Sequence, residues 1–268
     1  MAAPLEFVLR LLSESPVDLL KIAFLSYLLA CALVYLCITN DILSLKSDKD
    51  SDLVKKKILI LTAHPDDECM FFSPTIIYLS KTSEVFVMCT TSGNYYKKGE
   101  ERKKELLESC KILGVADHNV QVLDNSAFPD DPNAVWDLAL LGNEMRATIN
   151  RFQPDYVLTF DHHGVSGHSN HIFVSKAARQ IVHRSNFSHG AVKLLELETV
   201  GLLRKYTSFL ELPFSLKGDL VTFVSPFTEI LRAQKAMCAH NSQMVWFRVL
   251  YVIFSRYMVI NTFREVTS

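Results

Sequence analysis

Residues 57–68 read KILILTAHPDDE, a short apolar run that passes directly into one histidine and three acidic side chains. An uninterrupted apolar run of this length between turn signals is typical of a strand buried on both faces of a sheet. Similar runs recur downstream, separated by helical patterns, at residues 85–89, 120–123, 155–160, 192–197 and 220–224. Strands that alternate with helices predict an α/β fold, a Rossmann-like and mainly parallel sheet with helices on both faces.

Helical patterns fill the segments between these runs. The clearest covers residues 99–113, where Leu106, Cys110 and Leu113 form an apolar stripe opposite a face of charged residues. Further helices are expected at residues 67–80, 134–152, 168–184 and 226–240. We expect the strands and helices to form one domain over residues 57–268, because a chain of this length buries one substantial core.

An apolar segment without charges, residues 22–39, precedes this domain and is long enough to span a bilayer. A cleaved signal peptide and a buried core helix are the competing interpretations, but no small-residue cleavage site follows the segment. More lysines follow it than cations precede it, so the positive-inside rule predicts a single-pass anchor with everything after residue 40 in the cytosol. The expected organisation is a tail and transmembrane anchor over residues 1–40, a polar juxtamembrane linker over 41–56, and the cytosolic domain. The glycosylation sequon at Asn186 is then expected to stay unmodified.

The composition indicates which partners the chain contacts and whether its cysteines form disulfides. A hydrophobic content of 49% with a formal net charge of −1 indicates membrane contact and argues against a nucleic-acid partner. The six cysteines form no CxxC pair, so we expect reduced thiols. Residues 244–263 are apolar and aromatic, but Arg248 and Arg256 argue against a second span. We expect a helix packed on the domain or lying in the membrane interface, and plain core packing fits equally well.

The first apolar run delivers His64, Asp66 and Asp67 to the carboxyl end of the sheet, where open α/β sheets build their ligand sites. Adjacent residues in a turn point in different directions, so one aspartate can bind a metal while its neighbour accepts a proton from water. Two carboxylates this close repel each other, and a divalent cation relieves that cost. Taken alone, the motif also fits a turn with an aspartate N-cap.

A second cluster follows the apolar run at residues 155–160 and reads DHHGVSGHSNH, residues 161–171. His168 and His171 are expected on one face of the first helical turn, facing one cavity. A helix N-terminus lowers the pKa of an imidazole, which suits His171 as a neutral metal ligand, and Asp161 can offset the effect by pairing with His168. Taken alone, the cluster also fits a solvated loop. Together the two clusters supply a known set of donors for a catalytic zinc site, although Fe(II), Mn(II) and Co(II) accept the same donors.

These motifs resemble those of the eukaryotic N-acetylglucosaminyl-phosphatidylinositol de-N-acetylase family, within a wider group of sugar N-deacetylases. The likeness runs from about residue 57 to Phe263. HPDD and HxxH mark only the wider group, whereas the stretch from Asn94 to Tyr96 and the stretch GVSGHSNH are more specific. Other matching stretches are residues 102–107, 128–132, 159–161, 203–206, 246–248 and 253–258.

The resemblance implies a role for each residue of the two clusters. It implies His64, Asp67 and His171 as zinc ligands and Asp66 as general base, with His168 stabilising the oxyanion or assisting the leaving amine. It also implies a membrane phosphoinositide glycolipid as substrate and an endoplasmic-reticulum membrane location, with the catalytic face in the cytosol. His162 and His163 replace smaller residues of the family pattern, and we assign them no role.

Three further residues are candidates for binding the substrate: Asn94, Arg102 and Asp161. Arg102 lies at the polar start of its helix, near Asn94, and is expected to hold the substrate phosphate with two hydrogen bonds. A solvated residue in a run of charges is the alternative interpretation of Arg102.

The predicted function is hydrolysis of the acetamide of N-acetylglucosaminyl-phosphatidylinositol, an early step of glycosylphosphatidylinositol-anchor assembly. A deacetylase of another N-acetyl amino-sugar conjugate has the same chemistry. A non-catalytic membrane-bound subunit is a further alternative, and the retained Asp66 argues against it, because only catalysis requires a free carboxylate there.

Overall fold

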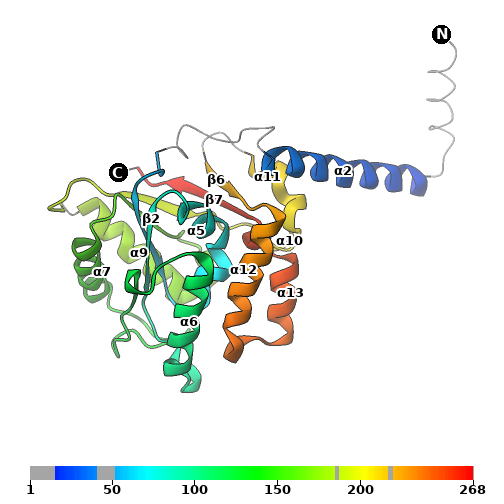
Figure 1. Ribbon diagram of the computed structural model, residues 1–268. Coiled ribbons are helices and arrows are strands. Elements are labelled where there is room, and N and C mark those ends of the chain that lie inside the picture. Colours follow the sequence, from blue (N-terminus) through cyan, green and yellow to red (C-terminus); the bar gives the residue numbers. More distant parts are fainter. Residues whose placement is uncertain (1–15, 41–51, 185–186, 217–219, 268) are drawn as a thin grey trace, which may run out of the picture. The chain divides into compact units, whose positions relative to one another are not determined.

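The computed structural model describes residues 16–40, 52–184, 187–216 and 220–267 (Figure 1). The chain divides into two compact units, residues 1–44 and 45–268. The predicted linker lies mostly outside the described residues, and so does Asn186.

The first unit contains the helix α2, Pro16–Thr39. Of the helices among the described residues, one is long and apolar enough to cross a membrane, and it covers Val17–Thr39. It begins before the predicted segment and includes Lys21, whose ammonium pairs with Asp18 at 2.8 Å. The helix therefore offers a candidate membrane span.

The second unit is built on a sheet of seven strands, in the order β3-β2-β1-β4-β5-β7-β6. The strands are β1 (Lys57–Thr62), β2 (Glu84–Cys89), β3 (Val120–Val122), β4 (Tyr156–Phe160), β5 (Lys193–Leu197), β6 (Val221–Val224) and β7 (Ile260–Glu265). The strands β1 to β5 pair in parallel, and β7 is antiparallel to both of its neighbours, β5 and β6. The predicted α/β fold with a mainly parallel sheet is confirmed.

Helices cover both faces of the sheet (Figure 1). One layer contains α7 (Leu138–Phe152) and α9 (Ser169–Arg184), which contact each other and β1. The other layer contains α5 (Ser73–Leu79), α6 (Gly99–Leu113) and α12 (Phe227–Ala239). Alternate β1 residues, Leu59 and Leu61, are buried in the core cluster beneath α7 and α9. Both faces of β1 are buried, as its unbroken apolar run predicts.

Shorter elements complete the unit. The helices are α4 (Asp67–Phe71), α8 (Gly164–Gly167), α10 (Leu202–Lys205), α11 (Leu212–Ser215) and α13 (Trp246–Phe254). Single 3-10 turns are η1 (Asn94–Tyr96), η2 (Asp117–Asn119), η3 (Ser208–Glu211), η4 (Asn241–Gln243) and η5 (Arg256–Met258). The helix α13 lies beside α12, where the Gln234 side chain donates to the Val252 carbonyl at 3.4 Å (Figure 1).

Several predicted boundaries are wrong, each for a local reason. The helix expected over residues 67–80 is two helices, because the backbone at Phe72 leaves helical geometry. The helix expected from residue 134 begins at Leu138, because the Asp137 carboxylate caps it by accepting the N–H groups of Ala139 and Leu140. The tail at 244–263 contains a helix followed by the buried strand β7, which was not predicted.

The order of the strands sets the position of the site. The strands β1, β2 and β3 follow one another outward across the sheet, and the chain then returns to place β4 on the other side of β1. The strand order therefore changes direction between β1 and β4. Parallel α/β sheets bind ligands outside the carboxyl ends of the strands at such a switch point. Both predicted clusters directly follow these two strands.

Candidate metal centre and active site

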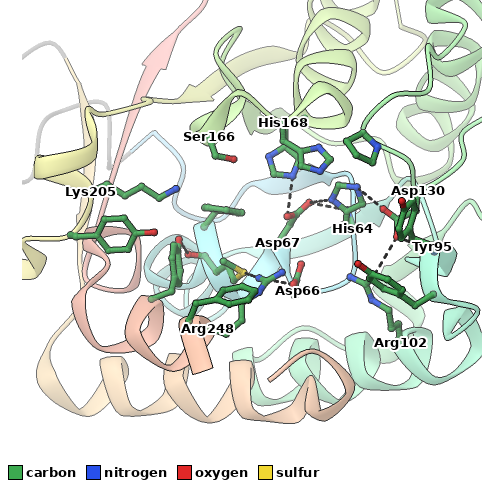
Figure 2. Close-up of a pocket in the computed structure, with 18 residues that line it drawn as sticks. His64, Asp66, Asp67, Tyr95, Arg102, Asp130, Ser166, His168, Lys205 and Arg248 are labelled. Carbon is green, nitrogen blue, oxygen red and sulfur yellow. Dashed lines mark hydrogen bonds and ion pairs between the residues drawn. The ribbon is translucent and has the colours of Figure 1, made fainter. Parts of the chain in front are cut away.

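A pocket of about 530 Å³ opens at the carboxyl ends of β1 and β4 (Figure 2). Its volume lies within the range of small-molecule sites. One end, called here the His/Asp end, contains His64, Asp66, Asp67, Asp130, His168 and His171. The other, called here the α10–α13 end, contains Lys205, Tyr206, Phe247, Arg248 and Tyr251. All of the predicted metal-site and proton-transfer residues line this pocket.

The turn after β1 fixes Asp67. Its Oδ2 accepts the backbone N–H groups of Ala63 and His64 at 3.0 and 2.8 Å. Its Oδ1 lies 3.2 Å from His171 Nε2, and its Oδ2 lies 3.7 Å from His64 Nδ1. Burial raises the pKa of the Asp67 carboxyl, but the two histidines outweigh burial and hold the pKa well below its usual range. Asp67 is therefore an ionised carboxylate between two imidazoles.

The two imidazoles have partners that suit metal ligands. The ring nitrogen of His64 that faces away from Asp67, Nε2, lies 3.2 Å from Asp130 Oδ1 and 3.0 Å from the Asn170 side-chain nitrogen. The corresponding nitrogen of His171, Nδ1, lies 3.1 Å from the Gly164 carbonyl. Metal-bound histidines almost always donate their second ring N–H to a carboxylate or a backbone carbonyl, which leaves the first nitrogen free for the metal.

The donor set and its charge also fit a divalent cation. The His64, His168 and His171 rings each offer a nitrogen, and these atoms lie within 4.8 Å of one another. Burial lowers the pKa of His64, yet the nearby Asp130 and Asp67 raise it above its ordinary value. The site thus favours positive charge, whether a proton or a metal ion. We identify it as a candidate His/Asp metal site.

Asp66 lies beside this donor set and has a strained backbone. Its φ is 121°, a conformation that L-residues rarely adopt. The Glu68 carboxylate holds the turn by accepting the Asp66 N–H at 3.0 Å, and the Arg248 guanidinium pairs with Asp66 Oδ2 at 2.7 Å. Burial raises the pKa of the Asp66 carboxyl against the opposing charge of Arg248. A carboxylate with a raised pKa accepts protons more readily.

His168 lies just before α9, not within its first turn as predicted. Its backbone is extended, and its carbonyl accepts the Ile172 N–H at 3.1 Å. Its Nδ1 accepts the backbone N–H of Asn170 at 3.3 Å, so a neutral ring carries its proton on Nε2. Burial and the neighbouring histidines lower the pKa of His168 to about 4. His168 is therefore a neutral imidazole at pH 7.

The predicted substrate-binding residues lie at different places around the site. Arg102 lines the pocket, and its terminal nitrogens donate to the Gly93 and Pro65 carbonyls, both at 2.9 Å, and contact Asp130 and Gln243. The bond to Pro65 holds the turn that carries Asp66.

The other two candidates support loops. The Asn94 side chain accepts the Gly99 N–H at 3.0 Å at the start of α6. The Asp161 carboxylate accepts the N–H groups of His163, Gly164 and Thr199 and the Thr199 hydroxyl. These bonds support the loop before α9, and no contact of Asp161 with His168 occurs within the described part of the chain. His162 and His163 contact each other, with ring centroids 3.8 Å apart.

Sequence reasoning assigned no role to Asp130 or to the α10–α13 end. Asp130 lies in a stretch, residues 128–132, that carries the family resemblance, so a signal for it existed. Lys205 likewise lies in a stretch that carries the resemblance, residues 203–206, whereas no matching stretch contains Tyr251, which reaches the pocket through the packing of α13.

Comparison with known proteins agrees with this site. The model of the family described as GlcNAc-PI de-N-acetylase matches residues 59–182, which include all six residues of the His/Asp end. The chain is 45% identical over 208 residues to the N-acetylglucosaminyl-phosphatidylinositol de-N-acetylase of Bos taurus, covering 77% of this chain and 82% of that protein. It is 34% identical to the probable enzyme of the same name from Dictyostelium discoideum, covering 82% and 97%.

Solved structures share the fold at much lower identity. The N,N'-diacetylchitobiose deacetylase from Pyrococcus horikoshii superposes with a TM-score of 0.60 at 19% identity, covering 88% of this chain and 92% of that chain. This likeness supports the description of the α/β fold.

Proposed function

We propose a function for this chain, which belongs to the GlcNAc-PI de-N-acetylase family. The chain hydrolyses the acetamide of N-acetylglucosaminyl-phosphatidylinositol and releases acetate and glucosaminyl-phosphatidylinositol, an early step of glycosylphosphatidylinositol-anchor assembly. The observation that carries the proposal is the buried Asp66 carboxylate directly beside the site formed by His64, Asp67 and His171.

The proposed cofactor is Zn²⁺, held by His64, Asp67 and His171. Two imidazoles and one carboxylate form a known catalytic zinc set with a position left open for water or substrate. When bound, zinc polarises the amide carbonyl and lowers the pKa of water from about 15.7 towards about 7. This supply of a nucleophile explains why the site needs no serine or cysteine.

The residues of the chain then handle protons and charge. Asp66 accepts a proton from the water whose oxygen forms the new bond to the carbonyl carbon. His168 donates a hydrogen bond from Nε2 to the carbonyl oxygen as negative charge develops there, a role that its neutral state and its tautomer support. Asp130 orients His64. Return of the proton to the nitrogen lets the C–N bond break and yields acetate and the free amine.

The substitution Asp66→Asn tests this assignment, because it keeps the shape of the side chain and removes the proton acceptor. Loss of a general base typically costs about 10²- to 10⁴-fold in rate. We expect acetate release by the detergent-purified protein to fall by that factor while bound zinc and the thermal unfolding midpoint stay as in the parent. Unchanged acetate release would remove Asp66 as the base.

The proposed location is the endoplasmic-reticulum membrane, with α2 as a single-pass anchor and residues 45–268 in the cytosol. The lysines that follow the apolar segment support this orientation. The sequon at Asn186 gives a direct test, because only a lumenal sequon is glycosylated. A mobility shift on endoglycosidase treatment of the full chain from cells would contradict the cytosolic orientation, and no shift is expected.

A further inference from the structure

One cation in the pocket has no anionic partner among the residues that the structure describes. Lys205 ends α10, is 9% exposed and lines the pocket, and Figure 2 shows its ammonium pointing into the cavity. Its Nζ lies 6.0, 5.8 and 5.7 Å from the ring centroids of Phe71, Tyr206 and Tyr251. No carboxylate of the described residues lies within ion-pair distance of it.

The other pocket cations are paired. Arg102 pairs with Asp130 at 3.3 Å, and Arg248 pairs with Asp66 at 2.7 Å. Burial and, secondarily, the charge of Arg248 lower the pKa of Lys205, so its surroundings do not compensate its charge. Buried charges in proteins are normally paired. An unpaired ammonium that faces a substrate cavity is a binding group for an anion.

We propose that Lys205 binds the phosphodiester of the lipid substrate, an inference that rests on the proposed function. In that substrate an inositol ring separates the phosphodiester from the acetylated sugar, so the anion must lie away from the reacting amide. In Figure 2, Lys205 and Asp130 lie on opposite sides of Asp67. In this arrangement the α10–α13 end binds the phosphate, and the acetamide is hydrolysed at the His/Asp end.

Two soluble substrates that differ only in the phosphodiester test this role. They are N-acetylglucosaminyl-inositol and its glycerophosphoryl derivative, assayed with the full chain in detergent. We expect the parent to prefer the phosphodiester and Lys205→Gln to lower that preference, as a ratio of kcat/KM values, by about tenfold or more. Lys205→Arg should retain most of the preference, and Lys176→Gln on the exposed face of α9 should keep all of it. Equal losses on both substrates in Lys205→Gln would overturn the proposal.

A binding measurement separates this inference from the proposed reaction. Calorimetry with glycerophosphoinositol needs no turnover, and we expect the parent to bind it at least about tenfold more tightly than Lys205→Gln. If neither sugar were hydrolysed but this difference held, the reaction would be wrong and the anion site right. Equal affinity of parent and variant would remove the anion site.

A second inference comes from the surface of α13. Its exposed residues follow helical spacing along one face, with Tyr251 and Val252 buried on the other. The exposed face consists of apolar side chains: Trp246, Phe247, Val249, Leu250, Ile253 and Phe254. An exposed apolar surface of this kind in a monomer marks a contact with a partner or a membrane.

Two observations favour a lipid bilayer as the occupant of the α13 face. Phe247 belongs to this face and also lines the pocket, so the apolar surface continues into the substrate site. Leu202 and Leu203 on α10 are also highly exposed, and Tyr206, directly after α10, contacts Tyr251 of α13 with ring centroids 6.3 Å apart. We infer that the α13 face inserts into the membrane interface and lets the head group of the proposed lipid substrate enter the pocket while its acyl chains stay in the bilayer.

Tryptophan fluorescence tests the insertion in the full chain. The chain has two tryptophans, of which Trp136 is 2% exposed and Trp246 is 75% exposed. In phosphatidylcholine vesicles with brominated acyl chains, we expect quenching of Trp246 that Trp246→Phe removes. Adding Val135→Trp to Trp246→Phe places an exposed tryptophan outside the α13 face, and it should not be quenched. Equal emission of the parent chain in brominated and plain vesicles would overturn the inference, whatever the enzymatic activity.

Discussion

At the His/Asp end of the pocket each carboxylate has a partner within the chain, whereas at the α10–α13 end Lys205 faces the cavity without an anion among the described residues. Asp67 contacts two histidines, Asp130 contacts His64 and Arg102, and Asp66 pairs with Arg248. A side chain whose hydrogen bonds and ion pairs are all made within the chain holds the reacting atoms in one geometry. An unpaired charge can instead form its ion pair with the substrate and so contribute to binding. The His/Asp end thus positions the reacting groups, and the α10–α13 end binds the substrate. The following substitutions test whether the two roles are separate.

The largest effect is expected from removing a metal ligand. His171→Ala should abolish measurable acetate release and bound zinc together. His168→Ala should retain zinc and lower kcat by about 10²- to 10³-fold, the cost of losing one oxyanion donor. Metal analysis of the purified proteins separates the two roles. Loss of zinc in His168→Ala would make that residue a ligand.

A buried network beneath the His/Asp end should have the next largest effect, on stability. The Glu68 carboxylate contacts the His240 Nε2 at 2.7 Å and the Ser109 hydroxyl, and all three side chains are fully buried. Glu68→Gln leaves His240 without its counter-charge, and breaking such a pair costs about 3–5 kcal/mol. We expect a marked fall in the thermal unfolding midpoint, with Glu108→Gln on the exposed face of α6 as control. An unchanged midpoint would show that the network is dispensable.

Asp130→Asn should weaken metal binding without removing a ligand. Loss of a carboxylate that orients a metal-bound histidine typically costs about 10- to 100-fold in affinity. Titration with zinc against a competing chelator measures this change, and Asp131→Asn gives a neighbouring control that does not contact His64. Equal zinc affinities in parent and Asp130→Asn would mean that Asp130 does not orient His64.

The smallest effect is expected at the α10–α13 end. The Tyr251 hydroxyl donates to the Met70 carbonyl at 2.8 Å, and this bond connects α13 to α4. Tyr251→Phe removes one hydrogen bond, worth about 0.5–1.5 kcal/mol of stability. Zinc content should stay at the parent value while the thermal midpoint falls slightly. Loss of zinc in this variant would show that the two ends are not separable.

The difference between the two ends also explains which parts of the site could be predicted from the sequence. His64 and Asp67 follow an apolar strand within a few residues, so a local pattern places them at the edge of the sheet. Their bonds to backbone N–H groups are also local. The pairing of β1 with both β2 and β4 then brings His171 beside Asp67.

The α10–α13 end depends on contacts between distant parts of the chain. The Tyr251 and Met70 contact joins residues 181 positions apart, and no local pattern records it. The strand β7 was missed because INTFRE mixes polar and apolar residues, and its place between β5 and β6 arises only in the assembled sheet. A charged helix start likewise does not reveal that Arg102 donates to the Pro65 and Gly93 carbonyls, and its role in binding the substrate stays a prediction.

The most direct test of a zinc-dependent deacetylase is acetate release from N-acetylglucosaminyl-phosphatidylinositol by the detergent-purified chain before chelation, after chelation, and after zinc is restored. We predict activity that the chelator removes and zinc recovers, with the folded state unchanged throughout. A folded, zinc-loaded protein that releases no acetate, or one whose activity survives complete removal of metal, would contradict the account.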